Sequence, residues 1–138
     1  MKAIRTLYLP MILILVAVVL GSCSFTTANY SNLVISSGIE SDYTPINVTS
    51  KFSTNTPEIY ISGKVNNAPT GTVISGQWFY MDNEPVIFID ESKYVVQDTT
   101  TSFYFSLSIP DNGWPVGEYS IQLFIDGKIQ KTLNFSVE

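Results

Sequence analysis

The sequence contains no histidine and a single cysteine, Cys23, in 138 residues. The absence of histidine excludes the Ser–His and Cys–His nucleophile arrangements and removes the usual zinc ligand. One cysteine cannot form an intramolecular disulfide. A folded domain in this chain must therefore be stabilised by the packing of its core.

Carboxylates are the remaining candidates for chemistry, either as the acid pair of a glycosidase or as calcium ligands. The acidic residues in question are Asp82, Glu84, Asp90, Glu91 and Asp111. They lie in predicted turns, where acids are common because they are solvated, and their spacing matches no known calcium loop. We interpret them as solvated loop residues, with glycosidase chemistry and calcium binding as the alternatives. We therefore expect no enzymatic activity, no catalytic residue, no metal site and no cofactor.

Positive charge is also scarce beyond the N-terminal segment. After residue 22, five lysines face twelve acidic residues, which gives a net charge of 5 − 12 = −7. Such an acidic chain repels phosphate backbones, so we expect no nucleic-acid partner. It also has little affinity of its own for anionic lipid.

The first 22 residues have the layout of a secretory signal, which we expect to form a helix. Lys2 and Arg5 precede an apolar run over residues 7–20, and the small residues Gly21 and Ser22 follow. A membrane-spanning helix needs about 20 apolar residues, and this run is shorter. We therefore predict an exported protein rather than one held by a permanent transmembrane helix.

The segment Leu20-Gly21-Ser22-Cys23 resembles the lipobox of bacterial lipoproteins. The resemblance implies cleavage before Cys23 and acylation of this cysteine, with palmitate as a typical acyl group. It predicts a signal peptide at 1–22, a lipidated Cys23 with a short tether at 23–32, and lipid anchoring to the cell membrane or outer membrane. The alternatives are an ordinary signal peptide followed by a free thiol, and an uncleaved anchor.

The rest of the chain, residues 33–138, has the pattern of a β domain. Alternation of apolar and polar residues is clearest over residues 119–125, where the odd positions are apolar. Asp126-Gly127 then predicts a type I′ hairpin turn. In the following strand, one face is predicted to carry Ile129, Leu133, Phe135 and Val137. Further segments, including a possible edge segment at 46–52, bring the total to about seven or eight strands, which favours an antiparallel sandwich.

The Pro115-x-Gly117-x-Tyr119 segment resembles the tyrosine corner of immunoglobulin-like (Ig-like) β-sandwiches. The resemblance implies that the Tyr119 hydroxyl bonds to backbone a few residues upstream, and that Trp78 is the buried core tryptophan. Disulfide-forming cysteines of antibody-type domains are absent from the chain. A sandwich of this kind supports many functions, so the fold alone assigns none.

Three aromatic residues are candidates for a contact patch. Phe79 and Phe124 fall on outward positions of strands predicted to be neighbours, and Trp114 lies in a loop where it could stack on a sugar or plug the end of the sandwich. By the same alternation, Tyr60 and Tyr104 point outward from neighbouring strands of the other sheet.

These features predict a membrane-tethered, non-catalytic binding or scaffold module whose partner is an unknown protein or envelope polymer. One alternative is a polysaccharide-binding module, which needs an exposed aromatic platform. Another is a small inhibitor or chaperone-like sandwich, which needs an open edge strand, expected near residues 86–96.

Overall fold

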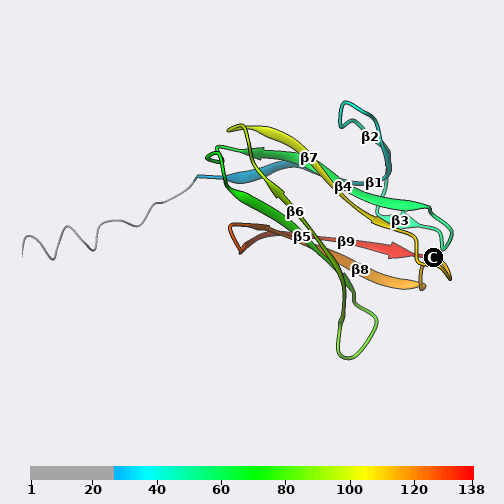
Figure 1. Ribbon diagram of the computed structural model, residues 1–138. Coiled ribbons are helices and arrows are strands. Elements are labelled where there is room, and N and C mark those ends of the chain that lie inside the picture. Colours follow the sequence, from blue (N-terminus) through cyan, green and yellow to red (C-terminus); the bar gives the residue numbers. More distant parts are fainter. Residues whose placement is uncertain (1–26) are drawn as a thin grey trace, which may run out of the picture.

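The computed structural model describes residues 27–138, so the signal segment at 1–22 and Cys23 lie outside the described residues. The described chain is all β and forms two packed sheets (Figure 1). The four-stranded sheet has the order β2-β1-β4-β7, and the five-stranded sheet has the order β3-β9-β8-β5-β6. The strands are β1 (Asn29–Ile39), β2 (Pro45–Val48), β3 (Lys51–Phe52), β4 (Glu58–Asn66), β5 (Val73–Tyr80), β6 (Ile87–Val95), β7 (Thr101–Ser108), β8 (Gly117–Ile125) and β9 (Lys128–Val137).

The predicted edge segment at 46–52 forms two strands rather than one, which corrects both the strand count and the purely antiparallel expectation. β2 pairs with β1, whereas β3 lies in the other sheet and pairs parallel to β9. The chain crosses between the sheets because Phe52 buries its ring edge-on against Phe135, with the ring centroids 5.7 Å apart. The described residues therefore contain nine strands, one pair of which is parallel.

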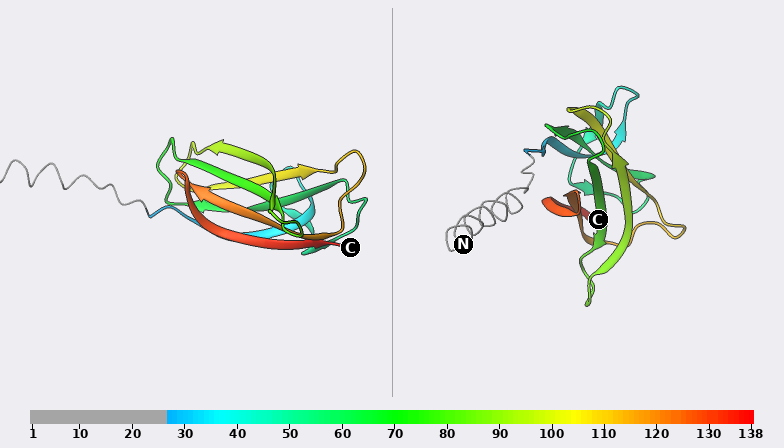
Figure 2. Two further views of the ribbon diagram at one scale, coloured as in Figure 1. Left: turned by 90° about the horizontal axis from the view of Figure 1, so that it is seen from below. Right: turned by 60° about the vertical axis from the view of Figure 1, so that its left-hand side comes forward.

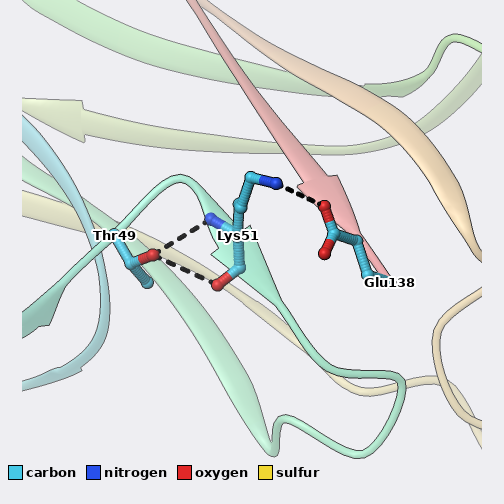
Figure 3. A network of polar contacts seen from close by, with 3 residues as sticks. All are labelled: Thr49, Lys51 and Glu138. Atoms are coloured by element: carbon cyan, nitrogen blue, oxygen red, sulfur yellow. Dashed lines mark hydrogen bonds and ion pairs between the residues drawn. The ribbon is translucent and has the colours of Figure 1, made fainter.

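Polar contacts around Lys51 hold β3 beside the end of β9 (Figure 3). The Lys51 backbone N–H donates to the Thr49 hydroxyl oxygen, and the hydroxyl donates back to the Lys51 carbonyl. The Lys51 ammonium lies 2.7 Å from the Glu138 carboxylate, and this hydrogen bond raises the pKa of Lys51. Both side chains are exposed, so the ion pair contributes little to stability.

The first strand starts earlier than predicted. β1 begins at Asn29, so residues 29–32 belong to the sheet, not to the predicted tether. The Tyr30 ring is buried against Phe103, with centroids 5.3 Å apart, and its hydroxyl donates a 2.7 Å hydrogen bond to the Phe124 carbonyl of the opposite sheet. This anchor fixes the point where the preceding chain leaves the domain, at the end of the sandwich opposite the C-terminus (Figure 2).

The predicted hairpin between β8 and β9 is present, with positive φ at both Asp126 and Gly127. A bulge changes the face of one predicted inward residue. Leu123 pairs with Lys131 but Phe124 pairs with Ile129, so β9 has one extra residue at this point. Ile129 is consequently 54% exposed. The prediction that it shares the inward face of Leu133, Phe135 and Val137 is therefore wrong.

The core lies between the sheets and is centred on aromatic residues. Trp78 is fully buried, and Tyr119 stacks on Phe135 with centroids 5.1 Å apart and ring planes 13° apart. The Tyr119 hydroxyl donates a 2.6 Å hydrogen bond to the carbonyl of Pro115, four residues upstream, as predicted. Burial raises the pKa of Tyr119 to about 12.

Candidate binding surfaces

Trp114 has a structural position rather than an exposed one. Its side chain is 3% exposed, and its indole N–H donates a 2.7 Å hydrogen bond to the Thr56 carbonyl. The ring also packs edge-on against Tyr119, with centroids 6.0 Å apart. Trp114 therefore closes one end of the sandwich, and the predicted role in a contact patch is wrong in this structure because the ring faces the core.

Phe79 and Phe124 share the outward face of the five-stranded sheet but do not form one patch. In the β5–β8 register, Phe79 lies opposite Ser120 and Phe124 lies opposite Ser75. The two rings are thus separated by four residues along the strand, about 13 Å, and Gln77 and Gln122 lie between them. Both side chains are half-buried.

The neighbour of Phe79 is instead Phe88 on β6. Their rings meet edge-on, with centroids 5.7 Å apart. Phe88 is 53% exposed, so this pair forms an apolar spot at the outer strand of the sheet. Phe88 was missed at the sequence level because residues 86–89 are all apolar and give no alternation from which to choose a face.

An exposed aromatic cluster lies on the outward face of the four-stranded sheet. Tyr60 on β4 and Tyr104 on β7 have ring centroids 5.9 Å apart, which confirms their predicted outward placement on neighbouring strands. Tyr43, from the turn between β1 and β2, adds a third ring 5.6 Å from Tyr104. Tyr43 and Tyr104 are each 45% exposed. We call Tyr43, Tyr60 and Tyr104 the tyrosine platform.

The turn that presents Tyr43 is held by its own backbone. Tyr43 has a positive φ of 72°, a conformation that is unfavourable for a bulky side chain. The Tyr43 N–H donates to the Glu40 carbonyl, the Glu40 N–H donates to the Thr44 carbonyl, and the Thr44 N–H donates to the Asp42 carboxylate. The Thr44 hydrogen bonds lower the pKa of Asp42. No alternation extends into a turn, so no sequence pattern pointed to Tyr43.

A hydrogen bond also holds Tyr60 in the platform. Its hydroxyl donates to the Glu58 carboxylate across 2.8 Å, and this bond raises the pKa of Tyr60. Tyr60 is half-buried between its neighbours. The platform therefore has one fixed ring and two more exposed rings.

Two open grooves, each of about 340 Å³, meet at Tyr43 and Ser102. The first runs along β7 toward β6, and the second crosses the sheet toward β1. The first is lined by Tyr43, Ser92, Lys93, Tyr94, Ser102, Phe103, Tyr104, Phe105 and Ser106. The second is lined by Asn32, Val34, Asp42, Tyr43, Thr44, Pro45, Ser62, Gly63, Lys64 and Ser102. The two grooves thus combine aromatic rings with hydroxyl, amide and charged side chains.

A third, smaller cavity opens between the two sheets near Trp114. It has a volume of about 180 Å³ and is lined by Tyr80, Ile87, Ile89, Leu107, Ser108, Pro110, Trp114, Pro115 and Tyr119. The polar tips of its aromatic residues already have partners, because Tyr80 and Tyr119 donate to the carbonyls of Val116 and Pro115. This cavity offers packing surface but no free polar group from these residues.

Two of the acidic residues that were candidates for chemistry, Asp82 and Asp90, accept backbone hydrogen bonds. The Asp82 carboxylate accepts the Glu118 backbone N–H at 3.0 Å, and that of Asp90 accepts the Glu91 N–H at 2.8 Å. Among residues 27–138, no group of three or more His, Cys, Asp or Glu side chains could hold a metal ion. In the same part of the chain, no helix is long and apolar enough to cross a membrane.

The sequence matches no protein family and no curated protein. Solved structures share the sandwich. The alkylpurine DNA glycosylase AlkC of Pseudomonas fluorescens, bound to DNA containing an abasic site analogue, superposes with a TM-score of 0.54 at 10% identity. The match covers 82% of this chain and 31% of the glycosylase, so it concerns a part of that protein.

Two shorter proteins are matched over most of their length. The sensor domain of the anti-sigma factor RsgI4 of Pseudobacteroides cellulosolvens has a TM-score of 0.48 at 12% identity, covering 82% of this chain and 89% of that domain. A Niemann-Pick type C2 protein from the Japanese carpenter ant has a TM-score of 0.45 at 11% identity, covering 83% and 94%. At 10% identity, the superposition on AlkC shows a likeness of fold alone.

Proposed function

We propose that this chain is an exported lipoprotein, anchored through Cys23, that carries an Ig-like sandwich as a non-catalytic binding module. The charged and then apolar N-terminus, which ends in Leu20-Gly21-Ser22-Cys23, supports export and acylation. The Tyr119 corner and the buried Trp78 support the Ig-like assignment. Stable anchoring needs more than one acyl chain, which a bacterial-type lipidated cysteine carries.

The tyrosine platform is the observation that carries the binding role. The Tyr104 ring contacts both other rings on an outward sheet face, and Tyr43 and Tyr104 stay exposed although each carries a large apolar surface. Clustered exposed aromatics typically mark a contact surface. The positive φ of Tyr43 is a further indication, because a strained conformation held by turn hydrogen bonds is typical of functional positions.

The ligand class that fits this surface is a polysaccharide of the cell envelope. Sugar rings present apolar C–H faces to aromatic rings and hydroxyls to polar side chains. The platform supplies the rings, and the polar groove beside it supplies Asn32, Asp42 and Lys64 as hydrogen-bonding groups. A groove that crosses the sheet suits an extended polymer better than a compact ligand.

Replacing Tyr104 tests the binding role, because its ring contacts both other rings of the platform. Affinity electrophoresis in gels containing a glucan, a xylan or a mannan, together with sedimentation with purified peptidoglycan, would measure retention. We expect the wild type to be retained by one of these polymers and Tyr104→Ser to bind about tenfold more weakly, a loss typical of one removed stacking contact. Phe88→Ser is the matched control, since it removes an equally exposed ring from the other sheet. Equal retention of all three proteins, or no retention of the wild type, would contradict the proposal.

The anchor is tested separately by the intact mass of the protein from the membrane fraction. A chain that begins at Cys23 and carries acyl mass, together with an unmodified Cys23→Ser variant, is the expected result. An unacylated wild-type chain would refute the lipoprotein assignment and leave the binding role standing.

A further inference from the structure

The outer strand of the five-stranded sheet has an open edge. β6 pairs with β5 on one side, and no described strand pairs with its other side. In Figure 1 the tip of the β5–β6 hairpin extends beyond the rest of the sheet. Farther along β6, an open groove lies between Ser92–Tyr94 and β7. Open edges with a complete row of backbone groups readily pair with another strand.

The edge is also the most apolar exposed part of the described chain. Within or beside β6, large hydrophobic side chains with at least a third of their surface exposed are Val86, Ile87, Phe88, Ile89, Tyr94 and Val95. Natural edge strands usually avoid such exposure by being short or by carrying proline or lysine. β2 and β3 follow that rule, because β3 has two residues and β2 has four, starting at Pro45. β6 is longer, with nine residues, and its lysine, Lys93, lies 3.6 Å from Glu91 of the same strand.

The charges of β6 favour a second copy of the same strand as its partner at this edge. Glu91 and Lys93 lie on the outward face of the sheet, on either side of Ser92. Antiparallel pairing of two β6 strands about a two-fold axis at Ser92 places Glu91 of each copy opposite Lys93 of the other. Opposite charges on directly paired residues stabilise a sheet, and this register provides two such pairs. We propose that β6 is a self-association edge that joins two copies of this chain into one continuous ten-stranded sheet.

The register falls on the regular part of the strand. A bulge lies between the pairs Trp78–Asp90 and Phe79–Phe88, and it bends β6 at Ile89. From Asp90 to Val95 the pairing with β5 is uninterrupted. The two-fold axis at Ser92 uses this stretch from Asp90 to Tyr94 and brings Asp90 of one copy level with Tyr94 of the other. The other long edge strand, β7, has no charged residue in Thr101–Ser108 and so has nothing comparable to fix a register.

A cysteine at the two-fold axis provides a direct test. Directly opposed residues in an antiparallel pair have Cα atoms about 4.5–5.5 Å apart, a separation that a disulfide bridges. We expect full-length Ser92→Cys, oxidised mildly in the membrane fraction, to be trapped as a dimer on a non-reducing gel. The wild type controls for any reaction of Cys23. Thr132→Cys, on exposed β9, controls for random collision.

Charge reversal tests the register itself. In the Ser92→Cys chain, Glu91→Lys and Lys93→Glu each place like charges opposite one another, so each should reduce the trapped dimer about tenfold. The double reversal Glu91→Lys/Lys93→Glu restores complementarity and should restore the dimer. These side chains are on the surface, and their ion pair within one chain spans 3.6 Å, so the fold should tolerate each change.

The proposal does not depend on acylation of Cys23. It uses Ser92 and Lys93, which also line the first of the two grooves that meet at Tyr43. It is overturned if Ser92→Cys stays monomeric, if Thr132→Cys is trapped equally well, or if single reversals leave the dimer unchanged. Trapping of Ser92→Cys to a different protein in place of a second copy would also overturn it, and would favour a client strand instead.

Discussion

Removing the Tyr119 hydroxyl isolates the energy of the tyrosine corner. The substitution Tyr119→Phe keeps the ring, its stacking on Phe135 and its edge contact with Trp114, and deletes only the 2.6 Å hydrogen bond to the Pro115 carbonyl. A buried hydrogen bond contributes about 0.5–1.5 kcal/mol net, and the burial of Tyr119 places it at the upper end. We expect the free energy of unfolding to fall by about 1.5 kcal/mol and the Tm by about 5 °C.

The neighbouring Tyr80 gives a matched control. Its hydroxyl also donates to a backbone carbonyl, that of Val116 at 2.9 Å, but this bond is exposed, so water replaces it in Tyr80→Phe. Urea unfolding followed by the fluorescence of Trp78 and Trp114 measures both variants. Tyr119→Phe should lower the midpoint with an unchanged slope, and Tyr80→Phe should shift it by less than a third as much. Equal shifts would refute the assignment of a special role to the corner.

Four other outcomes follow from the same structure. Trp114→Phe should lower the free energy of unfolding by about 1–3 kcal/mol, because it leaves the buried Thr56 carbonyl without its hydrogen bond. Polysaccharide retention should stay unchanged. Lost retention with intact stability would contradict the buried placement of Trp114. Tyr30→Phe should destabilise the domain by about 1 kcal/mol in the same urea assay, because the first strand loses its bond to the opposite sheet. Gly76→Ala should cost about 1–3 kcal/mol, since its Cβ would lie 2.9 Å from the Phe105 ring, and an unaltered midpoint would show that the core yields there. Burial raises the pKa of Tyr30 and of Tyr119 above the ordinary value of 10.0, so the unfolded chain loses these protons first. The contribution of these two tyrosines to the free energy of unfolding should therefore stay level below pH 10 and be lost as the pH rises to about 12, with a smaller loss in Tyr119→Phe.

Local alternation predicted most inward residues and failed where the backbone departs from regular pairing. Two features of the sequence were enough to predict the burial of Tyr119, Trp78 and Phe135. They are the two-residue alternation and the resemblance of residues 115–119 to a tyrosine corner. Ile129 was placed on the wrong face because a bulge inserts one residue, and hydrophobicity alone does not locate a bulge. Tyr30 was missed because it is a single aromatic in a polar segment, so its burial depends on partners far away in the sequence.

Knowing which strands are neighbours was not enough to predict which aromatic side chains contact each other. The strands of Phe79 and Phe124 are neighbours, as predicted, but their register places the two rings four residues apart along the strands. The Tyr60 and Tyr104 rings contact each other because the two residues are diagonal neighbours on paired strands, a separation that long side chains span. The sequence pattern thus predicts which strands are neighbours. It does not predict which side chains meet across them, because that depends on the register.

The proposed anchor and the proposed dimer together constrain how the molecule sits on a membrane. Six residue steps separate Cys23 from Asn29, so the tether spans at most about 21 Å. A two-fold axis normal to the sheet makes the paired strands antiparallel, so the N-terminal ends of the two sandwiches point in opposite directions. Both tethers reach one membrane only if the strands lie along its plane.

In that arrangement one sheet face points toward the lipid. The tyrosine platform must stay open to a polymer, so we expect the five-stranded sheet to face the membrane, with β1 about 10 Å farther away and still within reach of its tether. A fluorophore on Thr132→Cys, on the outward face of the five-stranded sheet, should then be quenched by a lipid-borne quencher, and one on Ser102→Cys beside the platform should not. Equal quenching at both positions would mean that the domain stands upright, and the anchor and the β6 dimer could not then occur together in one membrane.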